Sequence, residues 1–88
     1  MQKVFNRYAD PGHSWTKVPY ALLTELNIAE HITGCSYQRG EYVYLEEDCD
    51  LSTFFEAYGG KYGFKPILRS FHTNRQSKIR KYCSFFGF

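Results

Sequence analysis

Residues 44–50, with the sequence YLEEDCD, hold the densest group of side chains that could do chemistry in this chain. The carboxylates and the thiol of this stretch belong to Glu46, Glu47, Asp48, Cys49 and Asp50. Carboxylates at this density can bind a cation, share a proton as general acid and base, or present an acidic surface. At the start of a helix they also stabilise the positive end of the helix dipole. The surrounding sequence must separate these four interpretations.

The sequence that follows favours a helix start. Apolar side chains occur at positions i, i+3, i+4 and i+7, which is the spacing of one helix face. These side chains are Leu51, Phe54, Phe55 and Tyr58. We expect Asp48 or Asp50 to cap this helix by accepting free backbone N–H groups, and Gly59-Gly60 to end it. The acidic surface predicted at this strand-to-helix junction consists of Glu46, Glu47, Asp48 and Asp50.

A metal site is not predicted. A calcium-binding EF-hand loop needs a central glycine and oxygen ligands at alternate positions, and EEDCDLSTFFEA has neither. A zinc site needs three or four Cys or His ligands, which usually occur at short spacings. The cysteines and histidines are scattered along the chain at Cys35, Cys49, Cys83, His13, His31 and His72. We therefore expect no metal and no cofactor.

Catalysis is not predicted either. Cys49 is the one candidate nucleophile, because it lies near the expected helix N-terminus, but the adjacent carboxylates should raise the pKa of its thiol. Water at a surface junction should also give the neighbouring carboxylates similar pKa values. A general acid and a general base need different pKa values, so no acid–base pair is expected. The sequence has no phosphate-binding loop, dinucleotide-binding glycine pattern or GxSxG motif. We expect no catalytic residue and no enzyme activity.

Charge is distributed unevenly, although the formal net charge is only +2. Residues 41–56 contain six acidic residues and no Lys or Arg, whereas residues 61–88 contain seven basic residues and no acid. This asymmetry fits two oppositely charged surfaces. It fits equally well two segments that neighbour each other in the fold and neutralise one another.

The basic C-terminal stretch, residues 73–88, is predicted to form the last helix. Its apolar face at helical spacing would consist of Ile79, Tyr82, Cys83 and Phe86, so Cys83 is expected to be buried. The polar face and helix start would present His72, Asn74, Arg75, Lys78, Arg80 and Lys81. This is the usual footprint of a nucleic-acid-binding helix, but the pI of about 8.5 is below the ~9 of dedicated binders. A solvated helix face is the alternative.

A second candidate contact lies in the stretch PGHSW, which contains His13 and Trp15. Tryptophan is enriched at the energetic centres of protein interfaces. The alternative is that Trp15 folds back against the first helix.

The remaining sequence predicts a small α+β domain. A strand over residues 3–8 precedes a turn at Pro11-Gly12, and a helix with Pro19 in its first turn ends near Asn27. A hairpin is centred on Arg39-Gly40, and Pro66 places the strand within residues 64–72 at a sheet edge. We expect residues 1–88 to form one domain with an antiparallel sheet of about three to four strands, packed by three to four short helices.

Cysteine usage and hydropathy predict the compartment. The three cysteines form no CxxC pair, and the N-terminal residues contain no apolar segment of a secretory signal. No stretch approaches the ~20 apolar residues that cross a bilayer. We expect free thiols, a cytoplasmic location and no membrane partner.

Four stretches, RYADPGHSWTKVP, ELNIAEHIT, SYQRGEYVYLEEDCD and HTNRQSKIRKY, resemble a group of small uncharacterised proteins encoded by bacteriophages and other mobile elements. The resemblance implies a bacterial host cell as the setting. Small proteins in that setting often block host defence complexes, as anti-CRISPR and anti-restriction proteins do. No residue role is implied by it.

Two functions are therefore expected. The first is a non-enzymatic binding protein that acts stoichiometrically on a host protein or ribonucleoprotein complex, as an anti-defence inhibitor. The alternative is a small nucleic-acid-binding module that uses the basic C-terminal helix. The net charge of +2 excludes mimicry of DNA by the whole surface, so that only residues 41–56 could provide a local acidic patch.

Overall fold

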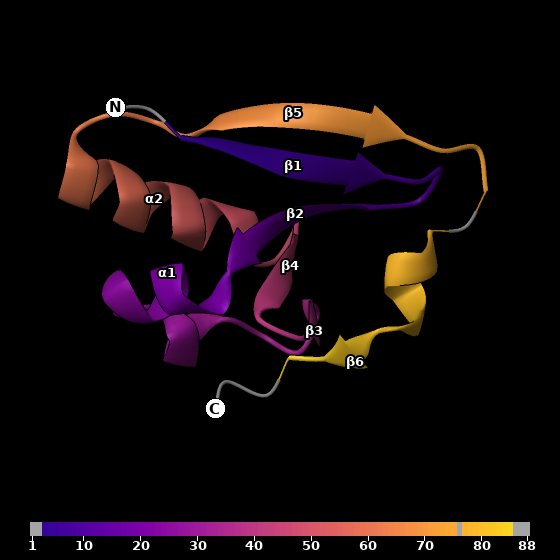
Figure 1. Ribbon diagram of the computed structural model, residues 1–88, viewed down its shortest axis with the longest axis horizontal. Coiled ribbons are helices and arrows are strands. Elements are labelled where there is room, and N and C mark those ends of the chain that lie inside the picture. The colour runs from indigo at the N-terminus through magenta and orange to yellow at the C-terminus, as the bar shows by residue number, and fades with distance from the viewer. Residues whose placement is uncertain (1–2, 76, 86–88) are drawn as a thin grey trace.

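The structure is a computed structural model that describes residues 3–75 and 77–85. These residues form a six-stranded sheet, two α-helices and two short 3₁₀-helices (Figure 1). In chain order the elements are β1 Val4–Ala9, β2 Ser14–Pro19, α1 Tyr20–Glu25, η1 Ala29–His31, β3 Tyr37–Arg39, β4 Tyr42–Glu46, α2 Leu51–Tyr62, β5 Ile67–His72, η2 Lys78–Lys81 and β6 Cys83–Ser84.

The sheet is mixed, with the strand order β5-β1-β2-β4-β3-β6. Strands β1 and β2 form an antiparallel hairpin, and β2, β4, β3 and β6 continue the antiparallel pairing. Strand β5 pairs with β1 in parallel, after a connection through α2 (Figure 1). The prediction of an antiparallel sheet of three to four strands with three to four helices is therefore wrong.

Residues 14–19 account for part of this error. The sequence predicts a turn that breaks the first strand and then a helix with Pro19 in its first turn, but residues 14–19 form strand β2. Each residue of the stretch is buried or half-buried, and β2 pairs with β1 on one side and β4 on the other. A strand covered on both faces loses the polar–apolar alternation by which a sequence reveals it.

The C-terminal stretch accounts for the rest. The helix predicted over residues 73–88 is replaced, within the described residues, by η2 and the short strand β6. Thr73 Oγ1 accepts a hydrogen bond from Arg75 N, and Ser77 Oγ accepts one from Ile79 N. Such local bonds compete with an α-helix. Cys83 pairs with Gln38 at the sheet edge and is exposed, so the prediction that it is buried is wrong; Phe86 lies outside the described residues.

Other predicted features are confirmed. The β3–β4 hairpin turns at Gly40, which has a positive φ of 61°, and Asn27 closes the first helix with a φ of 59°. The helix that follows the acidic stretch begins at Leu51 as expected. It continues past Gly59-Gly60, however, and ends at Gly63 in the left-handed conformation. The low helix propensity of glycine does not end the helix here, because the apolar face of the helix still packs on the sheet.

The two faces of the sheet differ. On one face, α1 and α2 pack against alternate strand residues to form the main core. This core includes Phe5, Val18, Val43 and Leu45 from the strands and Leu23, Phe54 and Tyr58 from the helices. On the other face a smaller cluster forms around Trp15, Tyr44 and Ile79, with η2 as its cover. We call this second side the open face.

Candidate functional site

Strand register gathers aromatic rings on the open face. Residues paired across neighbouring strands point to the same side of a sheet. Tyr8 is paired with Trp15 on β2 and with Phe71 on β5, and Tyr37 is paired with Tyr44. The same alternation adds further members, and the open face then presents Tyr8, Trp15, Tyr37, Tyr42, Tyr44 and Phe71. The ring of Phe71 stacks on Tyr8 with centroids 5.5 Å apart.

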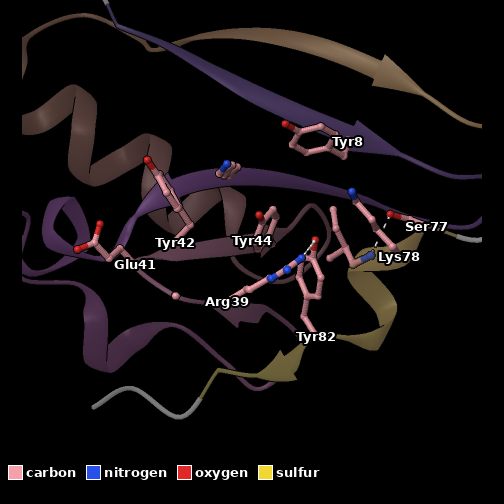
Figure 2. A pocket seen from close by; sticks show the side chains of 11 residues that line it. Tyr8, Arg39, Glu41, Tyr42, Tyr44, Ser77, Lys78 and Tyr82 are labelled. Atoms are coloured by element: carbon pink, nitrogen blue, oxygen red, sulfur yellow. Dashed lines mark hydrogen bonds between the residues drawn. The ribbon is translucent and has the colours of Figure 1, made fainter.

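A pocket of about 520 Å³ opens among these rings, a volume within the range of ligand-binding clefts (Figure 2). Four tyrosines from β1, β4 and the segment after η2 wall it, and three cations project into it from β2, β3 and η2. The aromatic and charged lining residues are Tyr8, Tyr42, Tyr44, Tyr82, Lys17, Arg39, Lys78 and Glu41.

Two of the three cations lie against aromatic rings. Lys17 Nζ is 4.2 Å from the ring centroid of Tyr42, and the Arg39 guanidinium is 5.1 Å from that of Tyr82. Arg39 Nη1 also donates a hydrogen bond to the Tyr82 hydroxyl at 3.2 Å, as Figure 2 shows. Cation–π attraction therefore holds positive charge on an aromatic surface, where it remains available to an anion.

The tyrosine at the centre of the pocket stays protonated at neutral pH. Burial raises the pKa of Tyr44 to about 12, with smaller contributions from Tyr82 and Tyr8. Its hydroxyl can therefore donate or accept a hydrogen bond, but it is a poor proton acceptor for catalysis at neutral pH. The pocket offers aromatic stacking surfaces, hydroxyl groups and cations held on rings, which is the chemistry of binding.

Among the residues predicted to bind, Lys78 lines this pocket. His72, Asn74, Arg75 and Lys81 are exposed but do not line it. The α-helix that was expected to align them is replaced by the short 3₁₀-helix η2, and a binding role for these four residues stays a prediction.

Arg80 is held by an ion pair rather than directed to solvent. Its Nε lies 2.6 Å from Asp10 Oδ2 and its Nη2 lies 2.9 Å from Asp10 Oδ1, while the guanidinium stacks on Trp15 at 5.3 Å. Asp10 Oδ2 also accepts a hydrogen bond from Ser77 N, and Oδ1 accepts from the backbone of Gly12 and His13. The carboxylate thus ties the η2 segment to the β1–β2 loop.

This network affects both the charge of Asp10 and the pocket. The Arg80 guanidinium, with further help from the Ser77, His13 and Gly12 N–H groups, holds the pKa of the Asp10 carboxyl far below its usual range despite burial. Because Lys78 and Tyr82 flank Arg80, the same ion pair positions two walls of the pocket.

The acidic stretch is divided between the interior and the surface. Glu46 and Asp50 are buried. Asp50 occupies the N-cap position of α2, but its carboxylate accepts hydrogen bonds from Thr33 and Ser36 and anchors the loop before β3. The expected capping role is therefore wrong. Glu46, the last residue of β4, is paired with Trp15 on β2, and its N–H donates to the buried Ser36 Oγ, so its carboxylate lies in the interior.

The exposed remainder of the predicted acidic surface is small. It consists of Glu47 and Asp48. Glu47 accepts a hydrogen bond from Ser14 Oγ at 2.7 Å and pairs with Arg7 at 3.4 Å, so much of its charge is compensated.

The two candidate contact residues of the stretch PGHSW also differ in burial. Trp15 is buried with Tyr44 and Ile79 on the open face, and not against the first helix. His13 is half-exposed beside Glu46. Cys49 is a poor nucleophile, because its pKa is raised to about 12, first by a hydrogen bond with Cys35, then by desolvation and by Glu46.

Sequence reasoning missed most of the pocket. Lys17 and Arg39 lie on strands that are separated in sequence, so their spacing along the chain gives no sign that they line one pocket. The available signal was the alternation that places Tyr42 and Tyr44 on one face of a strand. Tyr8 and Tyr82 join them only through long-range pairing.

Within the described residues, no helix has the length and apolar character needed to cross a membrane. Comparison of the chain with protein-family models, curated proteins and solved structures finds no match.

Proposed function

We propose that the open face binds single-stranded nucleic acid. The observation that carries this proposal is the convergence of Lys17, Arg39 and Lys78 on a pocket walled by four tyrosines. Proteins that bind single strands combine cations for the phosphate backbone with aromatic rings on which bases stack. Nucleic-acid binding was the alternative function expected from the sequence. The proposed binding surface is now the open face of the sheet and not a C-terminal helix.

The exposure of the rings supports single strands over duplexes. Tyr42 and Phe71 are 40% and 45% exposed, so each retains a face that a base can cover. Bases in a duplex are stacked on each other and cannot reach such rings, whereas unpaired bases can. The hydroxyls of Tyr8 and Tyr44 would then bond to base edges or sugars.

The expected inhibitor of a host defence complex stays a prediction, together with the bacterial cytoplasm as its setting. Both functions need a binding surface without catalysis. A protein partner would use the open face without a steep dependence on salt, whereas release of counterions from phosphates makes nucleic-acid affinity fall steeply with salt.

The test is titration of fluorescently labelled, unstructured oligonucleotides, with anisotropy as the readout at several salt concentrations. Tyr42→Ala should weaken binding about 5- to 150-fold, the equivalent of about 1–3 kcal/mol for one stacked base. Tyr42→Phe keeps the ring and should bind nearly as well as the wild type.

Lysine variants provide a matched pair. Lys17 lies over the ring of Tyr42, and Lys61 lies over the ring of Tyr62 on α2. Lys17→Ala should weaken binding and reduce the salt slope by about 0.7, the value for one phosphate contact with a single strand. Lys61→Ala should do neither. Equal effects of the two variants, or no binding by the wild type, would reject the proposal.

A further inference from the structure

A second and smaller pocket lies where the β1–β2 loop meets the turn between β4 and α2. It has a volume of about 300 Å³. Its walls bring together potential metal ligands that are far apart in sequence, namely His13, Cys35, Glu46, Asp48 and Cys49. None of them lines the 520 Å³ pocket of the open face.

Three of these groups are already at ligand spacing. One nitrogen or oxygen from each of His13, Glu46 and Asp48 lies within 4.8 Å of the other two. His13 Nδ1 is 3.3 Å from Glu46 Oε1. Two ligands of a tetrahedral zinc ion, each bonded at 2.0–2.1 Å, are separated by about 3.3–3.5 Å. The imidazole and the carboxylate therefore stand at the separation of two ligands of one metal ion.

The buried carboxylate provides independent support. Glu46 has a side chain nine-tenths buried, and its Oε1 has no hydrogen-bond partner among the described residues. Its other oxygen accepts a hydrogen bond from Asp48 N at 3.0 Å, which fixes the carboxylate in place. A buried and unpartnered carboxylate oxygen is costly, and a proton or a cation shared with His13 would remove that cost.

The kinds of ligand select the metal. Imidazole nitrogen favours zinc and similar transition metals over magnesium and calcium, and thiolates favour them further. Cys35 and Cys49 line the same pocket. We propose that His13, Glu46 and Asp48 form a zinc site, with a cysteine thiolate, Cys49 first, as the fourth ligand. This proposal does not depend on nucleic-acid binding.

Surrounding charges permit a cation here. The one basic side chain lining the pocket besides His13 is Arg80, and its guanidinium is already paired with Asp10 at 2.6 Å. The candidate ligands come from the β1–β2 loop and from the β4–α2 turn. A bound ion would therefore add a link between two segments that already meet through the β2–β4 pairing and the Ser14–Glu47 hydrogen bonds, and would stabilise the folded protein.

The test compares thermal unfolding of the chelator-treated protein with and without added metal. Zinc at about 100-fold above its Kd should raise the melting temperature by roughly 10–20 °C, whereas magnesium and calcium should leave it unchanged. His13→Ala and Asp48→Asn change exposed residues and should fold normally. Each should lower zinc affinity, by about a hundredfold or more for His13→Ala, because losing a residue that only supports a ligand already costs about 10- to 100-fold; calorimetric titration measures it.

The chain contains its own control, because His31 lies 3.9 Å from the exposed Glu30. His31→Ala should retain wild-type zinc affinity. A wild-type protein that zinc does not stabilise, or an equal loss of affinity in His31→Ala and His13→Ala, would overturn the proposal. Substitution with cobalt then identifies the fourth ligand, since a thiolate-to-cobalt charge-transfer band that is lost in Cys49→Ser assigns Cys49, and persistence of the band in Cys49→Ser overturns that assignment.

Discussion

The two faces of the sheet are built from the same strands but carry different chemistry. Beneath the helices, the strands contribute Phe5, Val18, Val43 and Leu45, all buried in one apolar cluster. On the open face the same strands contribute tyrosines, a tryptophan and cations, and among the described residues the cover comes from the short η2 segment and Tyr82 after it. One face excludes water, and the other keeps contact with it.

The difference shows how a small sheet can be stable and also bind a ligand. Aliphatic side chains have no polar atoms, so they contribute to stability when they are buried away from water. Tyrosine contributes a large apolar ring and a hydroxyl that can remain wet, so it can pack on a sheet and still contact a partner. Stability should therefore depend mainly on the helix-covered face, and binding on the open face.

The largest expected effect is on the helix-covered face. Phe54 is fully buried and packs edge-to-face on Phe5 at 5.4 Å. Phe54→Ala should lower the free energy of unfolding by about 3–5 kcal/mol, because it leaves a cavity. Tyr42→Ala on the open face should cost less than about 1 kcal/mol, since the ring is 40% exposed. Urea denaturation measures both, and equal losses would contradict the division between the faces.

An intermediate effect is expected where the open face is anchored. Asp10 has a side chain only 1% exposed, whereas Arg80 is 26% exposed. Asp10→Asn should lower the free energy of unfolding by about 2–3 kcal/mol, less than for a fully buried pair because water partly screens Arg80. Hydrogen exchange should then show weakened protection in residues 77–82.

This effect should depend on pH. The folded-state pKa of Asp10 is depressed, while an unfolded aspartate titrates near pH ~3.9. The ion pair therefore contributes its full stabilisation above about pH 4, and this contribution is lost as the pH falls below that value. The stability difference between wild type and Asp10→Asn should shrink between about pH 4 and pH 2. A constant difference would show that the charge of Asp10 is not what matters.

The smallest effect is expected at the edge of the sheet. Cys83 is exposed on the short strand β6. Cys83→Ser should change stability by less than about 0.5 kcal/mol, as is usual for surface substitutions. A thiol reagent should label Cys83 in the native protein at nearly the rate found in denaturant. Strong native protection would mean that this edge is covered.

The sequence alone determined the features that depend on neighbouring residues. The spacing of Leu51, Phe54, Phe55 and Tyr58 predicted α2, because helical periodicity is a local property. Asn27 and Gly40 marked turns, because both positions adopt a positive φ that these residues tolerate. The alternation of Tyr42 and Tyr44 likewise indicated one aromatic side of a strand.

Only the tertiary structure decided which distant residues meet. The same helical spacing in the C-terminal stretch failed as a predictor, because pairing with β3 and the Asp10–Arg80 ion pair hold that segment in another conformation. The parallel pairing of β5 with β1 has no local signature, since it depends on a long connection. The meeting of Lys17 with Arg39, and of His13 with Glu46, follows from strand pairing across the sheet, which sequence spacing does not record.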